Sequence, residues 1–459
     1  MDFTSNITIL ALLLFFLGYF LIYRYFKENI LAINIFVAAS SLCMYALWYP
    51  PAVLILLFYA VLVRYAGNAL HQSGSKALLR ALVVLMVVIL AFFKYYIFFV
   101  VLVTRNLSSL MNVFVPLGIS FFTCTIIGYF IDIHRKDALP PANLIESILF
   151  VSFWPSISSG PILRGGNFFQ YAKRREPVTR NTFALSAVLI ASGIIKKILI
   201  ADNLGSFVNW NLAFGVARLD VHEAWATMIG FIGQIYGDFS GYSDMAIGFA
   251  LLLGFRLPAN FNYPYIASSL GELWRRWHMS FSYWLRDYVY IPLGGSRKGK
   301  ARKYINLLIT FVVSGIWHGT GLNFIIWGSL QGLVISIEDF LGPRYTRLNR
   351  YLRRAITFFI FVTAATFFRL DAKHAVTMLS KMFFYNSLNF RMSTATYFMP
   401  LLLVFGFVVI DHWLKFYKVN DSGYPEINSK PLVVIILCVL LLLALLFPGQ
   451  DQPFIYFKF

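Results

Sequence analysis

Residues 80–105 read RALVVLMVVILAFFKYYIFFVVLVTR, and Lys94 is the only charged residue between the two terminal arginines. A helix that crosses a bilayer needs about 20 apolar residues in a row. Three further stretches carry no charge at all, namely residues 30–49, 392–410 and 431–448. Soluble proteins do not contain four such runs, so the sequence predicts an integral membrane protein with several spans.

The composition of the whole chain supports this prediction. Of the 459 residues, 59% are hydrophobic and 13% are charged, whereas a soluble domain has about 25% charged residues. The net charge is +19. Cytoplasmic loops of membrane proteins collect Lys and Arg, so this excess needs no nucleic acid as partner. We expect the lipid bilayer to contact the outer surface.

The basic residues also predict an orientation. The first apolar run, residues 7–23, has no basic segment before it and is followed by Arg24 and Lys27, so it is interpreted as a retained span rather than a signal peptide. If the N-terminus lies outside, the first five spans leave only Arg105 in an outside loop. The inside loops then hold Arg24, Lys27, Arg64, Lys76, Arg80, Arg135 and Lys136. The positive-inside rule favours this orientation.

One segment resists interpretation as a simple span. Residues 144–163 contain several Pro, Gly and Ser residues, and a full crossing there would place the basic residues 173–175 outside. Irregular backbone survives at membrane depth only where protein or a cavity surrounds it. We therefore predict that this segment enters the membrane and returns on the cytoplasmic side.

A second segment, residues 263–302, is too polar to face lipid. Helical spacing begins at Ser268, with Ser269 as the expected N-cap and Glu272 as its capping-box partner. Two interpretations remain open. The segment is either an amphipathic helix on the cytoplasmic surface or a helix buried beside a water-filled cavity.

Seven histidines are present, and His318 differs from the others. It stands in SGIWHGTG, residues 314–321, at the end of an apolar helix expected from about Tyr304. The small neighbours leave room for a substrate, and burial favours a neutral imidazole that can accept a hydroxyl proton. The alternative is a buried histidine bonded to a backbone carbonyl. His278 is a candidate assisting group, and a polar structural role is expected for His71, His134, His222, His374 and His412.

Two carboxylates, Asp238 and Asp244, lie in an otherwise apolar stretch and need partners. The expected partners are Arg275, Arg276 and Arg286. No GxSxG, CxxC, HExxH or P-loop motif occurs, and the three cysteines lie singly. A nucleophile triad and a metal site are therefore not expected.

Three stretches resemble the membrane-bound O-acyltransferase (MBOAT) superfamily, especially its bacterial alginate O-acetyltransferase-like branch. They are QIYGDFSGYSDMAIG (234–248), LWRRWHMSFSYWLRDYVYIPLGGSR (273–297) and IWHGTGLNFIIWG (316–328). Residues 115–137, 159–164 and 195–204 fit the same branch.

This resemblance implies an all-α polytopic fold, a ring of about 10–12 membrane helices with re-entrant segments around a central pore. It implies one domain over residues 1–459, made of N-terminal spans (1–141), a catalytic core (142–345) and C-terminal spans with a tail (346–459). It identifies His318 and His278 as the catalytic histidines. Residues expected to line the pore or contact substrate are Trp274, Arg276, Trp277, Ser280, Asp287, Trp317, Asn323, Asp238, Ser240 and Tyr242.

The activity implied by the resemblance is transfer of an acetyl group from a cytoplasmic thioester. Acetyl-CoA is the expected donor, bound near the basic loops 173–175 and 297–303, and no bound cofactor is expected. The acceptor would be an extracytoplasmic polysaccharide such as alginate, cellulose or peptidoglycan, reached through a separate SGNH-hydrolase-like O-acetyltransferase. The expected location is the bacterial cytoplasmic (inner) membrane. Transfer of D-alanyl or other acyl groups to an envelope polymer and a polytopic transporter remain alternatives.

The last six residues, FIYFKF (454–459), resemble the FxYxxF ending of small partner peptides in teichoic-acid D-alanylation. The resemblance implies that Tyr456 carries the acyl group as a phenyl ester, with Phe454 and Phe459 as docking groups. The alternative is an aromatic anchor at the membrane interface.

Overall fold

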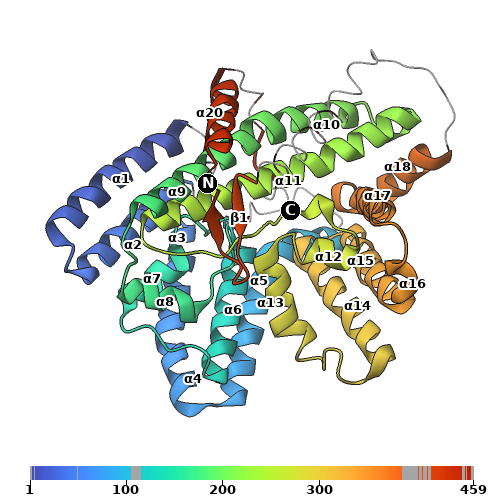
Figure 1. Ribbon diagram of the computed structural model, residues 1–459. Coiled ribbons are helices and arrows are strands. Elements are labelled where there is room, and N and C mark those ends of the chain that lie inside the picture. The colour runs from blue at the N-terminus through green and yellow to red at the C-terminus, as the bar shows by residue number, and fades with distance from the viewer. Residues whose placement is uncertain are drawn as a thin grey trace. The chain divides into compact units, whose positions relative to one another are not determined.

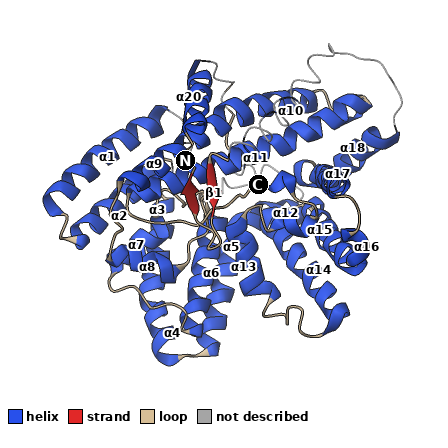
Figure 2. Cartoon of the chain, in the orientation of Figure 1, coloured by secondary structure: helices blue, strands red, loops and turns tan. Residues whose placement is uncertain are grey.

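In the computed structural model the chain is helical almost throughout, with one short hairpin of two strands (Figure 1, Figure 2). The structure describes residues 3–4, 6–48, 50–104, 115–384, 415–428, 430–446 and 452–455, together with positions 402, 406, 411 and 450. The chain divides into two compact units. Unit 1 contains residues 1–186 and 245–258, and unit 2 contains residues 187–244 and 259–459.

Six helices of the described part are long and apolar enough to cross a membrane. They cover Ile7–Phe26, Ala52–Ser73, Lys76–Tyr96, Arg180–Ala213, Leu322–Leu341 and Arg350–Arg369, and Ile30–Ala46 and Pro431–Leu446 are shorter apolar helices. The predicted all-α polytopic fold is therefore confirmed. The prediction of 10–12 membrane helices also counted residues 392–410, which lie outside the described residues apart from positions 402 and 406.

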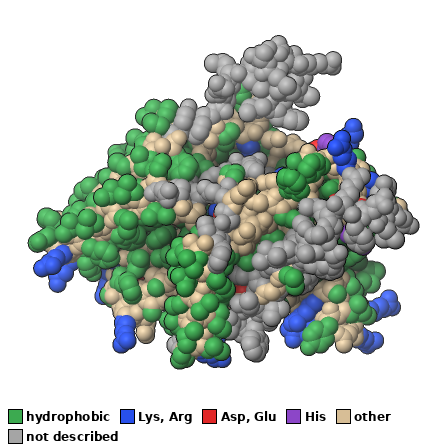
Figure 3. Space-filling view, turned by 90° about the horizontal axis from the view of Figure 1, so that it is seen from above, with side chains coloured by type: hydrophobic (Ala, Val, Ile, Leu, Met, Phe, Trp, Pro, Cys, Tyr) green, Lys and Arg blue, Asp and Glu red, His purple; other side chains and the backbone are tan. Residues whose placement is uncertain are grey.

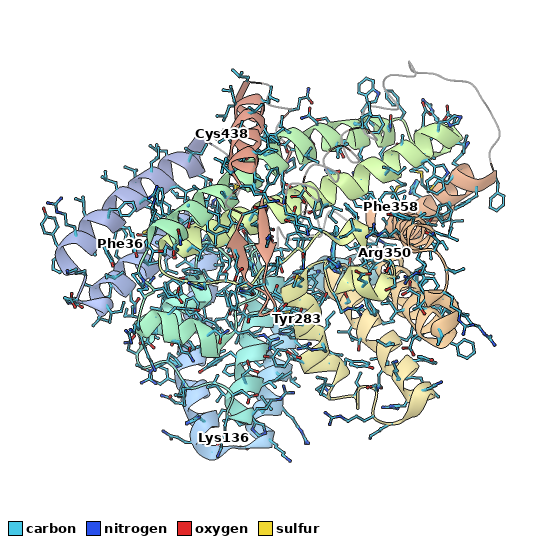
Figure 4. All side chains as sticks on the ribbon, viewed as in Figure 1. Phe36, Lys136, Tyr283, Arg350, Phe358 and Cys438 are labelled. Atoms are coloured by element: carbon cyan, nitrogen blue, oxygen red, sulfur yellow. The ribbon has the colours of Figure 1, made fainter. Side chains whose placement is uncertain are left out.

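The exposed side chains of the membrane helices are apolar and suit contact with lipid. On the first span Ile7 is 72% exposed and Leu13 64% exposed, which water would disfavour and hydrocarbon does not. Figure 3 shows one face on which hydrophobic side chains cover broad areas while Lys and Arg gather in small groups at the margins. Basic residues mark helix ends, as Lys136 does after α6 and Arg350 does at the start of α17 (Figure 4).

Unit 1 is built from the N-terminal helices. They are α1 (Asn6–Phe26), α2 (Ile30–Ala46), α3 (Ala52–Val61), the π-helical η1 (Leu62–Ala66), α4 (Gly67–Ser73), α5 (Lys76–Thr104), α6 (Ile119–Arg135), α7 (Leu144–Ser152) and α8 (Gly165–Lys173). The fully buried Trp154 is at the centre of an aromatic cluster, with ring centroids 5.3 Å from those of Phe15 and Phe249.

The segment after α7 is irregular, as the sequence predicts. Helix α7 has nine residues and ends at Ser152, and residues 153–163 then continue through turns that are buried within unit 1. Residues 144–163 therefore form no single spanning helix. The side of the membrane from which they enter stays a prediction.

Unit 2 begins within α9 (Arg180–Ile195) and holds the first part of α11 (Val221–Leu252). Its other elements are η3 (Lys196–Asp202), α10 (Asn203–Ala213), η4 (Val216–Arg218), η5 (Pro264–Ile266), α12 (Leu270–Trp274), α13 (Met279–Leu285), η6 (Arg286–Tyr290), α14 (Gly299–His318), α15 (Leu322–Leu341), α16 (Pro343–Thr346), α17 (Arg350–Arg369), α18 (Ala372–Phe384), β1 (Tyr417–Val419), β2 (Pro425–Ile427) and α20 (Pro431–Leu446). Strands β1 and β2 pair antiparallel, with Lys418 opposite Glu426.

The predicted helix start at Ser269 is confirmed. Its Oγ accepts a hydrogen bond of 3.0 Å from the Glu272 amide, and Glu272 Oε2 accepts one of 2.8 Å from the Ser268 amide. The predicted continuity is wrong, because α12 ends at Trp274 and α13 starts only at Met279. His278, between them, has the left-handed φ of 43° that ends regular helix. This break decides how the histidine is presented.

Candidate active site

His318 is the last residue of α14, and it is 3% exposed. Gly319 follows in an extended conformation, and a Cβ atom there would stand 2.0 Å from the Phe324 ring. The chain can therefore leave the helix at this point only with glycine. The sequence pattern of small residues around the imidazole reflects close packing of this turn against α15.

The His318 side chain lines a small cavity inside unit 2. The cavity volume is about 20 Å³, enough for a water-sized molecule. Its walls come from α11, α12, the turn that follows α12, α14, α15 and α17. The lining residues are Phe231, Ile232, Ile235, Trp274, Trp277, His318, Trp327, Phe361, Ala365 and Phe368. His318 is the titratable group among them, and the other side chains are apolar or aromatic.

Aromatic rings fix the imidazole from several sides. Its centroid lies 4.8 Å from that of Trp317, 5.2 Å from that of Trp327 and 5.0 Å from that of Phe368, all in edge-to-face geometry. Such contacts hold a ring in place without supplying a charge. The imidazole therefore sits in an environment that disfavours water.

His278 belongs to the same aromatic cluster and is 1% exposed. Its ring stacks on Phe281 at 5.0 Å, and the Phe281 ring lies 5.8 Å from that of His318. Trp317 likewise contacts both histidines, at 6.1 Å from His278. The second interpretation of residues 263–302, a segment buried in the protein, agrees with this burial. The two histidines, far apart in sequence, share two aromatic neighbours.

Asn260 holds the turn that presents His278, and the sequence reasoning missed it. Its carbonyl oxygen accepts from the Met279 amide at 2.8 Å, and its Oδ1 accepts from Ser280 Oγ at 2.7 Å. Its Nδ2 donates to Ser243 Oγ at 3.1 Å. A buried Asn after a Gly- and Pro-containing turn was the available signal. The predicted Ser280 thus supports the backbone of this turn.

Of the other predicted residues of this region, two line the cavity and the rest make contacts elsewhere in unit 2. Trp274 Nε1 donates to Gln331 Oε1 at 3.1 Å, and Asn323 Nδ2 donates to the Phe367 carbonyl at 2.9 Å. Two residues instead make ion pairs along the chain, since Arg276 Nη2 lies 3.0 Å from Glu272 Oε1 and Asp287 Oδ1 lies 2.8 Å from Arg286 Nε. Trp274 and Trp277 line the cavity, whereas Arg276, Ser280, Asp287 and Asn323 are not among its described lining residues.

The partners expected for the α11 carboxylates are wrong. Asp244 Oδ2 lies 2.8 Å from Lys196 Nζ, and Asp238 Oδ1 lies 3.3 Å from Lys197 Nζ. Both lysines stand in the π-helical turn η3, which widens the helix and turns two successive lysines inward. Arg276 and Arg286 pair instead with their own neighbours, Glu272 and Asp287. The double lysine within an apolar stretch was the overlooked signal.

The described part of the tail lies against the same face of α11. Phe454 is 3% exposed, and its ring centroid lies 5.2 Å from that of Tyr242. Ser240, also predicted, is fully buried on α11. Tyr456 and Phe459 lie outside the described residues, so their predicted roles stay predictions.

The basic loops differ in exposure. Lys298 and Lys300 are exposed at the start of α14. Arg175 is engaged within unit 1, because it donates to the Leu253 carbonyl at 2.8 Å and to Asn34 Oδ1 at 2.7 Å. Lys173 and Arg174 beside it are exposed, and binding of the acyl donor near these two loops stays a prediction. Within the described residues, no group of three or more His, Cys, Asp or Glu side chains could hold a metal ion.

This arrangement can support proton transfer to or from a substrate oxygen. A neutral imidazole accepts a proton, and apolar surroundings strengthen its interactions with a bound group. The cavity is smaller than an acyl thioester, so side chains at its wall must move for a substrate to enter.

Comparison with known proteins identifies the family of the chain and several relatives. The MBOAT, membrane-bound O-acyltransferase family, matches residues 134–372. The chain is 35% identical to a probable alginate O-acetylase of Pseudomonas putida over 76% of each chain. It is 30% identical to a peptidoglycan O-acetyltransferase of Helicobacter pylori over 97% of this chain and 94% of that protein. A teichoic acid D-alanyltransferase of Bacillus subtilis is 28% identical over 49% of this chain and 59% of its own length.

The family match includes both buried histidines, the aromatic cavity and the helices that enclose it. The relatives named as O-acetylase and O-acetyltransferase extend the likeness over most of the chain. A multi-pass helical protein with these matches is a membrane-embedded O-acyltransferase, and the chain belongs to the membrane-bound O-acyltransferase family.

Proposed function

We propose that this protein takes an acetyl group from acetyl-CoA on the cytoplasmic side and passes it through the membrane toward an extracytoplasmic polysaccharide. The observation that carries the proposal is the place of His318, the titratable group in a cavity walled by apolar and aromatic side chains. Alginate and peptidoglycan are the polymers in the names of its relatives. A polymer of this class, cellulose included, is the proposed final acceptor.

His318 acts as the general base in this proposal. It accepts the proton of an acceptor hydroxyl while that oxygen attacks the thioester carbonyl carbon. The carbon–sulfur bond breaks, and the departing thiolate takes the proton from the imidazolium. An ester and a free thiol result, and no proton is gained or lost overall. General base catalysis by a positioned imidazole contributes about 10²–10⁴-fold to the rate.

His278 is proposed to stabilise the developing oxyanion or orient the acceptor. Its ring shares Phe281 and Trp317 with His318, so a substrate held between these rings would meet both imidazoles. Trp274 and Trp277 line the cavity together with His318. We assign them to acyl-group positioning.

Tyr456 is the proposed first acceptor. Its phenol oxygen would take the acetyl group, and the resulting phenyl ester would be attacked by a hydroxyl of the next acceptor, which regenerates the phenol. The burial of Phe454 and Ile455 supports this step, because it brings the tail into unit 2. A separate SGNH-hydrolase-like transferase is the proposed recipient on the outer side of the bacterial cytoplasmic membrane.

The test is the replacement of His318 by Ala in protein purified with its fold intact. Release of CoA from acetyl-CoA should fall by about 10²-fold or more. His374→Ala is the matched control, since this exposed histidine pairs with Asp371 and lies outside the cavity lining. Normal CoA release by a correctly inserted His318→Ala protein would refute the proposal.

The donor needs its own experiment, because the Bacillus subtilis relative is named for D-alanyl transfer. Radiolabelled acetyl-CoA and a D-alanyl thioester carrier are supplied in turn to the same membranes. Label from acetyl-CoA should appear in polymer, and label from D-alanine should not. The reverse result would make this protein a D-alanyltransferase, while label in neither case would favour a transporter.

A further inference from the structure

The described end of the chain is held by two opposite charges. Lys197 Nζ donates a hydrogen bond of 2.6 Å to the Gln452 carbonyl oxygen, and Asp238 Oδ2 accepts one of 2.5 Å from the Ile455 amide. The Lys197 cation thus binds the backbone carbonyl of residue 452, and the Asp238 carboxylate binds the backbone amide of residue 455. Hydrogen bonds to ionised groups are roughly twice as strong as neutral ones. The backbone of residues 452–455 is recognised at both ends.

Lys197, Asp202 and Asp238 form a buried cluster of charged side chains to which the tail contributes no residue. Lys197 Nζ lies 2.8 Å from Asp202 Oδ1 and 3.3 Å from Asp238 Oδ1, and the three side chains are 3–6% exposed. Lys197 and Asp202 are five residues apart, the spacing that faces one side of the π-helical turn η3. Buried ion pairs add little net stability compared with apolar packing. A cluster of this kind therefore suggests a role beyond stabilising the core.

Side chains of the tail are recognised as well. Gln452 Oε1 accepts from Asn209 Nδ2 at 2.9 Å, and its Nε2 donates to Ser206 Oγ at 3.2 Å. The Phe454 ring packs 5.2 Å from Tyr242 and 6.5 Å from Phe239. These contacts fix the register of the segment, since a shift by one residue would lose all of them.

The bound tail lies close to His278. The Phe239 ring contacts Phe454 and also lies 4.6 Å from the His278 ring. One aromatic side chain thus contacts both the docked tail and the proposed oxyanion-stabilising residue. Displacement of the tail would therefore change the packing of the Phe239 ring.

We infer that Lys197 and Asp238 form a clamp that binds the backbone of residues 452–455 and fixes the residue preceding Tyr456 beside the catalytic histidines. Both are positioning residues, because they act through the tail rather than on the substrate. The functional meaning of the clamp rests on the proposed role of Tyr456 as acyl carrier. The clamp itself is tested separately.

The test measures hydrogen–deuterium exchange of the C-terminal peptide in the full-length protein. In Asp238→Asn and Lys197→Met, the Ile455 amide should exchange faster by about tenfold or more, the effect of losing a charge-assisted bond. Asp244→Asn is the matched control. It removes a neighbouring buried ion pair, and among the described residues Asp244 bonds to Ser192, Lys196 and Tyr417 rather than to the tail. Equal exchange in the three variants and the wild type overturns the clamp.

A second pair of variants changes the tail alone, so that the membrane helices keep their sequence. Ile455→Pro removes the backbone N–H that donates a hydrogen bond to Asp238, whereas Ile455→Ala keeps it. Acetyl transfer should fall in the proline variant, and adding Asp238→Asn should cause no further fall, because both changes break the same bond. Additive losses would overturn the inference.

These readouts separate the clamp from the carrier. If Tyr456→Phe keeps full polymer acetylation while tail exchange still depends on Asp238 and Lys197, the carrier role fails and the clamp stands. If Tyr456→Phe abolishes acetylation and tail exchange ignores both residues, the carrier role stands and the clamp fails.

Discussion

Gly315 on α14 lies so close to Phe324 on α15 that a Cβ atom at position 315 would stand 2.2 Å from the Phe324 carbonyl oxygen. The contact is reciprocal, since a Cβ at Gly328 on α15 would stand 2.2 Å from the Phe311 carbonyl of α14. Small residues permit such backbone approach between membrane helices. His318 lies about one helical turn after Gly315. The close contact at Gly315 therefore fixes the position of His318 along α15.

Gly315→Ala should therefore separate the two helices and displace His318. Overpacking of this kind costs about 1–3 kcal/mol, and acyl transfer should fall even in the folded fraction. Thermal unfolding in detergent and CoA release measure the two effects. Gly271→Ala is the control, because its nearest foreign atom would be 3.7 Å from the new Cβ. An unchanged unfolding midpoint for Gly315→Ala would contradict the close packing.

Trp274→Phe tests the tie between α12 and α15. The change keeps an aromatic ring on the cavity wall and deletes the indole N–H that donates to Gln331. A buried acceptor that loses its donor costs about 1–3 kcal/mol. We expect lower stability and a higher KM for the acyl donor. Trp210→Phe, at an exposed position, should leave both unchanged.

Asn260→Ala should loosen the turn that carries His278. It removes the Oδ1 and Nδ2 contacts to Ser280 and Ser243 and leaves the backbone bond to Met279. The expected result is a lower kcat with a small change in KM, because the His278 imidazole becomes less well positioned. Steady-state kinetics check this, with Asn420→Ala in the hairpin as control. Equal kinetics in both variants would show that Asn260 is dispensable for the turn.

Asp371 precedes α18 and accepts hydrogen bonds from the Lys373 and His374 amides. The hydrogen bond with the His374 side chain holds the pKa of Asp371 below its ordinary value of 3.8. A depressed pKa means that the stabilisation is complete above pH 3.8 and is lost as pH falls through the folded value. Both side chains are exposed, so salt screens the effect.

Asp371→Ala should therefore fray the first turn of α18, at a cost of about 0.5–2 kcal/mol typical of a lost cap. Faster amide exchange at residues 373 and 374 near neutral pH measures it. Thr377→Ala on the same helix serves as comparison. In a His374→Ala protein, exchange corrected for its intrinsic pH dependence should be flat between pH 5 and pH 7, because Asp371 stays ionised there and no imidazole titrates beside it.

Hydrophobic runs predicted the helical membrane fold because lipid imposes a simple rule on length and charge. The same rule indicated that residues 144–163 are irregular. The break at His278 was not predictable from spacing, since left-handed backbone at a histidine depends on the bonds that Asn260 makes from another part of the chain.

The candidate site was predicted in part. His318, Trp274 and Trp277 line one cavity, and the resemblance to a family carried most of that prediction. The carboxylate partners were missed because a sequence does not show the π-helical turn that points Lys196 and Lys197 at α11. Phe281, the ring shared by both histidines, looked like any other apolar residue of its segment.

The backbone at His278 is strained, and the packing of the buried imidazole must offset that strain. A φ of 43° is unfavourable for every residue with a Cβ atom, and glycine would adopt it freely. Glycine at position 278 would relieve this strain, but it would leave a cavity among the rings of Phe239, Phe281 and Trp317. Any programme that engineers this enzyme for robustness should hold position 278 constant and seek its gains elsewhere.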